Sequence, residues 1–249
     1  MSIFANIRNP GVQSYCLRGF KDNAVVAQKT KAMGYDSIEI CAVHADFADP
    51  AAFAGVVDIY KKAGVAIGSM GVQTFTGDEA KERKWFECAK IAGAKYLTAH
   101  FTVGTYPEAV KVAMKLSDEF GIRLAIHCHG GYMFGGSFDV IEHLLKISGP
   151  QIGVCIDTAW CLQTGRGNPV EWVEKFGERL YGMHYKDFTF DRAAKWTDVI
   201  IGTGNLKLPE LLKAMEKVGF KGHAVIEYEG DVEKPDEALK ACLQAAKKA

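Results

Sequence analysis

The sequence has no surplus of charge of either sign. Its 30 lysines and arginines are matched by 30 aspartates and glutamates, so the formal net charge is zero, and no basic half or stripe is visible. Because binding to nucleic-acid phosphates requires clustered lysines and arginines, this balance argues against a dedicated nucleic-acid binder. The chain also has no apolar stretch near 18 residues and no signal-like start, so we expect neither a membrane span nor export.

Cysteine is present but forms no recognisable framework. The seven cysteines make no C-x-x-C pair, and three of them, Cys41, Cys128 and Cys155, lie in or beside apolar runs. Small thiols in such runs are commonly buried rather than paired. A reduced, cytoplasmic protein is therefore the expectation.

No proline- or serine-rich linker divides the chain, and short β-rich runs alternate with helical segments throughout. Strands are expected at residues 11–17, 35–40, 65–69, 96–100, 123–127, 153–156, 180–185 and 224–228. Helices are expected at 22–34, from 49, at 78–93, from 107, at 137–147, around 169–176, at 209–218 and at 235–247, with an irregular stretch at 188–205. Eight βα units in 249 residues predict an α/β fold: a single (β/α)8 TIM-barrel domain over residues 1–249.

Four of the expected strands in the second half of the chain end at residues that commonly bind metals. These are His127, Asp157, His184 and Glu227. If the strands are parallel, all four side chains emerge at the carboxyl edge of one sheet, where barrels carry their chemistry. Imidazole nitrogens and carboxylate oxygens suit Zn²⁺, Mn²⁺, Co²⁺ or Fe²⁺ better than Ca²⁺.

Each of these residues alone has an ordinary structural explanation. A single histidine at a strand end is usually a hydrogen-bonded rim residue, and a single aspartate there usually caps the next helix. Four coincident placements are harder to explain in that way, so together they favour a metal site.

The same segments resemble those of a known family. Cys155-Ile-Asp-Thr158, His184-Tyr-Lys-Asp187, Gly202-Thr-Gly-Asn-Leu206 and Val225-Ile-Glu-Tyr228 are similar to motifs of the xylose isomerase-like TIM-barrel superfamily of sugar isomerases and epimerases. That superfamily also includes inosose dehydratases and apurinic endonucleases. The resemblance spans nearly the whole chain. It implies metal ligands from strands five to eight, typically Glu, Asp, His and Glu.

The chain departs from the family pattern at two positions. His127 stands where the first glutamate usually lies, whereas Asp157, His184 and Glu227 match. That glutamate also serves as an acid or base in the epimerases, so a symmetrical two-glutamate mechanism is in doubt; the His127-x-His129-Gly130 motif is typical of a subgroup. Trp160 stands where a histidine often follows the strand-six aspartate, and an indole offers a face for a sugar rather than that polar contact.

The resemblance implies an enzyme that isomerises or epimerises a keto- or aldo-sugar through an enediolate. A divalent ion, Mn²⁺ first with Zn²⁺, Co²⁺, Fe²⁺ or Mg²⁺ as alternatives, would polarise the carbonyl and acidify the neighbouring C–H. We expect Glu227 to be a ligand with base function and His129 a general acid or base. Glu39, at the end of the second strand, is a candidate for substrate binding or proton transfer, and Lys186 for contact with a substrate oxygen.

Further residues are expected around a small-molecule sugar. His100 ends the fourth strand, and Asp187 follows Lys186 in a supporting position. Phe134, Trp160 and Trp196 offer apolar faces to a sugar ring. The sequence leaves the oligomeric state open, a homo-oligomer included.

Three other functions compete with this interpretation. Elimination of water from a keto-sugar or inosose by a hydratase or lyase would use the same ligands. A non-catalytic sugar-binding barrel would share the fold. An apurinic endonuclease would need several additional histidines near the mouth, but His143 falls within an expected helix and His223 near the start of a strand.

Overall fold

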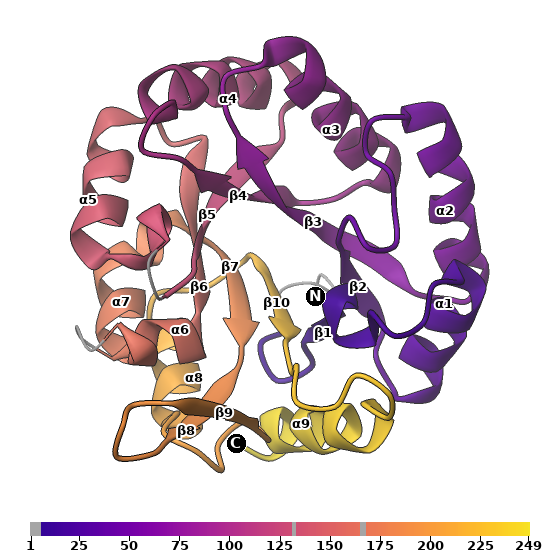
Figure 1. The fold of residues 1–249 in the computed structure, drawn as a ribbon, viewed down its shortest axis with the longest axis vertical. Helices are drawn as coiled ribbons and strands as arrows, with labels where there is room; N and C mark the ends of the chain where they lie inside the picture. Colours follow the sequence, from indigo (N-terminus) through magenta and orange to yellow (C-terminus); the bar gives the residue numbers. More distant parts are fainter. Residues whose placement is uncertain (1–5, 131–132, 165–167) are drawn as a thin grey trace.

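The computed structural model describes residues 6–130, 133–164 and 168–249, and it shows a closed barrel of eight parallel strands. The barrel strands are β1 (Gly11–Gln13), β2 (Ser37–Ile40), β3 (Ala66–Phe75), β4 (Tyr96–Phe101), β5 (Arg123–Cys128), β6 (Ile152–Asp157), β7 (Leu180–Tyr185) and β10 (His223–Ile226). Each strand pairs with its neighbours in chain order, and β10 closes the ring against β1. The predicted TIM barrel is confirmed (Figure 1).

Helices surround the strands in chain order, as the colour sequence in Figure 1 shows. The described α-helices are α1 (Asn23–Ala32), α2 (Pro50–Lys62), α3 (Glu79–Ala92), α4 (Tyr106–Phe120), α5 (Phe138–Ile147), α6 (Thr158–Gln163), α7 (Pro169–Phe176), α8 (Leu208–Lys217) and α9 (Asp236–Lys248). Local sequence fixes their starts, because Asp22, Asp49 and Asp78 each accept a backbone N–H of the first turn. Among the described residues, none of these helices combines the length and apolar character needed to cross a bilayer.

The barrel strands separate two regions of buried side chains, the core between the strands and the surrounding helices and the interior of the barrel. Along β5, Leu124, Ile126 and Cys128 join the main core beneath the helices, whereas the alternate residues face inward. Near the amino-terminal ends of the strands, the interior is filled by a small cluster of Tyr96, Ala125, Cys155 and Tyr181. Other buried inward-facing residues are polar, from Ser37 and His223 at the start of β2 and β10 to His127, Asp157 and His184 near the carboxyl ends of their strands.

The structure corrects several expected boundaries. The first strand ends at Gln13, and Ser14–Leu17 forms a short 3-10 helix whose first turn is capped by the Gln13 side chain. The stretch 188–205, expected to be irregular, contains an antiparallel hairpin of β8 (Asp187–Phe190) and β9 (Trp196–Val199). The last barrel strand ends at Ile226, one residue before Glu227.

Candidate metal centre and its pocket

His127, Asp157, His184 and Glu227 converge at the carboxyl end of the barrel. Each offers one ligand-type atom, all four atoms lie within 4.8 Å of one another, and all four residues are buried. His127 Nε2 lies 3.1 Å from His184 Nδ1 and 4.0 Å from Asp157 Oδ2. His184 Nδ1 in turn lies 2.5 Å from Glu227 Oε2. Atoms that share one cation at about 2.0–2.2 Å lie at separations of this order.

The hydrogen bonding of these side chains fits a cation. Asp157 Oδ2 is buried and, within the described ranges, has no hydrogen-bond partner, whereas Glu227 Oε2 contacts His184 Nδ1. A buried carboxylate oxygen without a donor is costly, and a divalent ion between the four side chains would satisfy Asp157 Oδ2. The donor set of two imidazoles and two carboxylates suits Mn²⁺, Zn²⁺, Co²⁺ or Fe²⁺.

Asp157 is held in place by the helix that follows it. Its Oδ1 accepts the backbone N–H groups of Ala159 and Trp160, both at 3.0 Å, at the start of α6. This leaves Oδ2 to face the other three ligands. The Asp157 carboxylate therefore caps a helix and faces the cluster at the same time. The two interpretations of Asp157 from sequence, a helix cap and a metal ligand, are compatible.

The protonation of the cluster follows from burial and charge. Burial, with the nearby imidazole of His184, holds the pKa of His127 well below its ordinary value. Burial raises the pKa of Asp157 to about 7, against the opposing charge of Lys186. Burial also disfavours charge on Glu227, but the charges of Lys186 and His184 outweigh it and hold its pKa well below the usual range. His127 is thus in the neutral form that binds metals.

A cavity of about 370 Å³ opens directly over the cluster. This is within the roughly 300–1,000 Å³ typical of small-molecule pockets. It is lined by Gln13, Tyr15, Cys41, Ala42, Val43, Gly71, Val72, His100, His127, His129, Trp160, Glu227 and Glu229. Three residues expected from sequence to contact a substrate, His100, His129 and Trp160, are on this wall.

The histidine wall of the cavity is held by ring packing. The His129 ring stacks on Trp160, with centroids 4.2 Å apart and planes at 26°. Its Nδ1 lies 3.3 Å from the Gly130 carbonyl oxygen, which can only accept a hydrogen bond. A proton on Nδ1 therefore leaves Nε2 as the atom with a free lone pair. His100 packs edge-on against both His127 and His129, and burial lowers its pKa to about 4.

Lys186 is buried beside the Glu227 and Glu229 carboxylates, 5.5 Å from the centre of the Trp160 ring, and does not itself line the cavity. Its ammonium group lies 3.5 Å from Glu227 Oε1 and makes a shorter ion pair with Glu229. The nearby Glu227 and Asp157 charges raise the pKa of Lys186 despite its burial. Lys186 is therefore a fixed cation next to the ligand cluster.

Other residues expected at the substrate site lie elsewhere. Asp187 is buried and accepts backbone N–H groups from Gly202, Gly204 and Leu206 at 2.8–2.9 Å. Phe134 packs on Tyr106, with centroids 5.3 Å apart, and is absent from the cavity lining. Trp196 lies on β9 behind Trp160, with centroids 5.2 Å apart, and is 41% exposed.

Glu39 lies beneath the cluster rather than on the cavity wall. It is fully buried, and its Oε1 lies 3.0 Å from His184 Nε2. Sequence reasoning missed Gln13, Tyr15 and Val72, which line the cavity. The end of β1 at Gln13 would have pointed to the first of these had the strand been correctly bounded.

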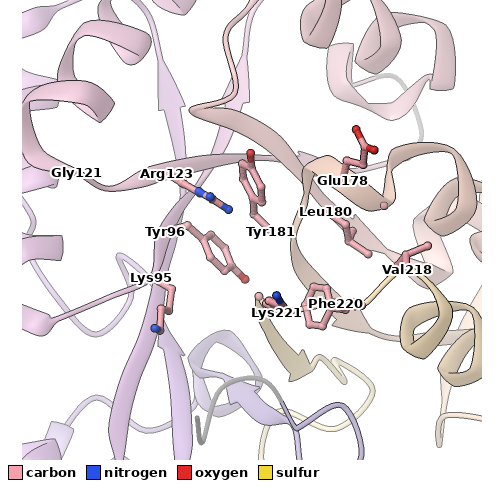
Figure 2. Close-up of a pocket in the computed structure, with 13 residues that line it drawn as sticks. Lys95, Tyr96, Gly121, Arg123, Glu178, Leu180, Tyr181, Val218, Phe220 and Lys221 are labelled. Carbon is pink, nitrogen blue, oxygen red and sulfur yellow. The ribbon is translucent and has the colours of Figure 1, made fainter. Parts of the chain in front are cut away.

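A second cavity, of about 480 Å³, opens at the other end of the barrel. Figure 2 shows Tyr96, Arg123 and Tyr181 around its centre, from the amino-terminal ends of β4, β5 and β7. The Arg123 guanidinium lies 4.5 Å from the centre of the Tyr181 ring. None of the four ligand-type residues lines this cavity, so the candidate metal site lies at the carboxyl end only.

Comparisons with known proteins agree with the fold. A family model described as a xylose isomerase-like TIM barrel matches residues 27–248. The rhizopine catabolism protein MocC of Rhizobium meliloti is 29% identical over 127 residues, which cover 45% of this chain but only 38% of MocC.

Two solved structures show the same likeness of fold at low sequence identity. The 3-keto-D-glucoside 4-epimerase YcjR of E. coli has a TM-score of 0.72 at 15% identity, covering 97% of this chain and 99% of that one. AsbF of Bacillus anthracis, described as a probable 3-DHS dehydratase, has a TM-score of 0.75 at 14% identity, covering 95% and 98%. The family model matches most of the chain, and the structure is the closed, parallel, eight-stranded barrel that this family description names. The chain therefore belongs to the xylose isomerase-like TIM-barrel family.

Proposed function

We propose that this protein is a divalent-metal-dependent sugar isomerase or epimerase that acts through an enediolate. The observation that carries the proposal is the buried His127, Asp157, His184 and Glu227 cluster at the floor of a cavity of small-molecule size. Mn²⁺ is the ion we expect. A bound divalent ion would polarise a substrate carbonyl and make the adjacent C–H more acidic.

The chain's own side chains supply the proton transfers and the orientation. His129 lines the cavity, protonation of Nδ1 leaves its Nε2 with a free lone pair, and burial lowers the pKa of this ring, so His129 is available as a neutral base. Lys186, held by Glu229 and Glu227, would donate a hydrogen bond to a substrate oxygen. Glu227 combines the roles of ligand and second acid or base. Trp160 keeps the His129 ring in plane and offers its remaining surface to the sugar.

A hydratase or lyase acting on a keto-sugar or inosose is the second candidate. One observation favours it: the cavity lining brings together unlike groups, the imidazoles of His100, His127 and His129 and the carboxylates of Glu227 and Glu229. Elimination requires a base for the C–H and a separate acid for the departing hydroxyl, and unlike groups suit that task. The fold likeness to AsbF is compatible with this alternative.

We expect the substrate to be a small sugar rather than a nucleic acid, and the protein to be cytoplasmic. The zero net charge and the seven free, buried cysteines support these two proposals. A non-catalytic sugar-binding barrel is an alternative that the test below distinguishes.

The function is tested by incubating Mn²⁺-loaded protein in deuterated water with ketohexoses, 3-keto-glucosides and inososes. Enolisation predicts incorporation of one deuteron at the carbon next to the carbonyl, detected by NMR. The variant H129N should lower the exchange rate by about 10²–10⁴-fold, the usual contribution of a general base. Loss of water in the mass spectrum would identify the dehydratase, whereas sugar binding without exchange or turnover across the panel would overturn the enzyme proposal.

A further inference from the structure

A chain of buried polar side chains runs down the inside of the barrel below the ligand cluster. It begins at His184, whose Nε2 lies 3.0 Å from Glu39 Oε1. Glu39 Oε2 lies 2.5 Å from the Ser69 hydroxyl, and Ser69 lies 2.9 Å from His223 Nδ1. His223 Nε2 then lies 2.9 Å from the Ser37 hydroxyl. All five residues are buried, so water does not compete for these contacts.

The direction of each hydrogen bond follows from which atoms can donate. An ionised carboxylate only accepts, so Ser69 must donate its single hydroxyl proton to Glu39. The Ser69 oxygen then accepts from His223, which places a proton on His223 Nδ1. His223 Nε2 is left as an acceptor for the Ser37 hydroxyl. Burial lowers the pKa of His223 to about 4, in keeping with this neutral, singly protonated ring.

Glu39 is almost saturated with donors. Besides Ser69 and His184, its Oε1 accepts from Gln13 Nε2 at 2.7 Å and lies 3.2 Å from the Thr98 hydroxyl. Burial disfavours the charged carboxylate, but the charge and hydrogen bond of His184 and the hydroxyl of Ser69 outweigh it and lower its pKa. A carboxylate that accepts from this many donors is a structural acceptor, and Glu39 itself does not line the cavity.

The barrel leaves space for this chain at two glycines. A Cβ added to Gly68 would lie 2.5 Å from Cε1 of His223, and one added to Gly11 would lie 2.8 Å from its Nε2. Any larger residue at either position would push the His223 ring out of line. The chain is therefore built into the packing of three barrel strands, β1, β3 and β10.

We propose that Glu39 is a positioning residue that keeps a proton on Nε2 of His184 and so turns Nδ1 toward His127, Asp157 and Glu227. Ser69 and His223 hold the Glu39 carboxylate in the orientation this requires. Carboxylates that accept from the second nitrogen of a metal-binding histidine fix its tautomer and raise its basicity. The inference rests on the proposed function only in taking His184 as a metal ligand. It replaces the expectation that Glu39 transfers protons to substrate.

The variant E39Q tests the proposal with little change in shape. A glutamine amide cannot accept from both His184 and Ser69, because one of its two positions is itself a donor. We expect Mn²⁺ affinity, measured by calorimetry, to fall by about 10–100-fold. In ¹⁵N-histidine NMR, the slowly exchanging proton on His184 Nε2 should be present in the metal-free and Zn²⁺-loaded parent protein and lost in E39Q.

The matched control is E82Q, which changes a fully buried glutamate on the outer helix α3. Glu82 accepts backbone N–H groups from Thr76 and Gly77 and takes no part in the ligand cluster. E82Q should retain the parent Mn²⁺ affinity and the His184 Nε2 proton. If E39Q fails to fold, S69A provides the test, since it removes the donor to Glu39 Oε2 and should also weaken Mn²⁺ binding.

The outcomes separate this inference from the proposed function. The role of Glu39 would be overturned if E39Q, or S69A in its place, bound Mn²⁺ as tightly as E82Q and the parent and retained the His184 Nε2 proton. A parent protein that binds Mn²⁺ more tightly than E39Q but exchanges no substrate proton would overturn the proposed function and support the inference.

Discussion

At the scale of single residues, Asp157 carries a conflict between stability and metal binding. Burial raises its pKa to about 7, so in the metal-free protein the ionised form is disfavoured. Because the unfolded value is near 3.9, the stability provided by the protonated form is complete below about pH 4 and is lost as the pH rises through about 7. The metal-free fold is therefore strained at neutral and alkaline pH by a charge that the metal site needs.

The variant D157N should accordingly stabilise the metal-free protein at pH 8. The amide oxygen can still accept from Ala159 and Trp160, while the buried charge is gone. We expect a gain of about 1–3 kcal/mol in the free energy of unfolding, measured with denaturant. The same variant should lose the stabilisation by excess Mn²⁺, which is about 2.7 kcal/mol at 100 times the dissociation constant.

The exposed Asp118, whose carboxylate accepts from Gln151, provides the comparison. D118N should leave both the metal-free stability at pH 8 and the Mn²⁺ effect near parent values. A D157N protein that is less stable than the parent without metal, or that is still stabilised by Mn²⁺, would contradict this account of the site.

Residue-level reasoning from sequence reached the ligand cluster but misplaced Glu39. His127, Asp157, His184 and Glu227 were predictable because parallel strands bring their carboxyl ends to one rim. Glu39 also lies near a strand end, and the same rule placed it at the mouth. The sequence does not show the register of neighbouring strands in the barrel. That register places Glu39 beside Ser69 and below His184.

At the scale of elements, the Asp187 carboxylate and Asn205 tie the β8–β9 hairpin to the segment that follows it. Asp187 accepts three backbone N–H groups from residues 202–206 and so ties the segment after β9 to the start of β8. Trp196 on β9 packs against Trp160, which in turn supports His129. The hairpin is therefore part of the support of the cavity wall, although Trp196 itself does not line the cavity.

Removing this carboxylate should loosen the hairpin and the wall together. We expect D187A to cost on the order of 3 kcal/mol in the free energy of unfolding, because buried backbone donors lose their acceptor. Trp196 fluorescence should shift to the red, and KM for the active substrate should rise more than kcat falls. D191A removes a carboxylate that accepts from Ala193 and Lys195 in the exposed hairpin turn, and it should change stability by less than about 0.5 kcal/mol. Equal effects of the two substitutions would show that Asp187 has no special role.

The hairpin was not predicted because its strands carry a weak pattern. β9 reads Trp-Thr-Asp-Val and is exposed or half-buried, so no alternation of buried and exposed residues distinguishes it from a loop. The helix α6 was missed for another reason: at six residues, it is too short to show a helical period. In contrast, the longer helices were recognisable from their aspartate caps and terminal glycines.

At the scale of the whole molecule, the barrel was predictable by counting and its interior was not. Eight repeats of strand and helix within 249 residues leave few other arrangements, and the ring closes between β1 and β10. The aromatic cluster and the polar chain inside the barrel depend on contacts between strands far apart in sequence. Tyr96 on β4, for example, donates to the backbone carbonyl of His223 on β10. Such pairings follow from the register of the closed barrel, which no single segment specifies.

If the candidate site binds a divalent ion, the affinity of the protein for that ion should depend on pH. Burial lowers the pKa of His184, but the Cys155 sulfur and the Glu39 and Glu227 carboxylates outweigh it and raise the pKa well above its ordinary value. A metal must therefore displace a proton from His184 at all pH values up to this raised pKa. Below about pH 7 it must also displace one from Asp157.

Mn²⁺ binding should consequently release about two protons between pH 5.5 and 6.5 and about one above pH 7.5. The dissociation constant should fall about 100-fold per pH unit in the lower range and about tenfold in the upper range. Calorimetry in buffers of different ionisation enthalpy measures both quantities. H143Q, on the outer helix α5, should give the same profile as the parent. If the logarithm of the dissociation constant changed with pH at one constant slope over the whole range, Asp157 would bind no proton near neutral pH. Some other contact would then have to stabilise its buried charge.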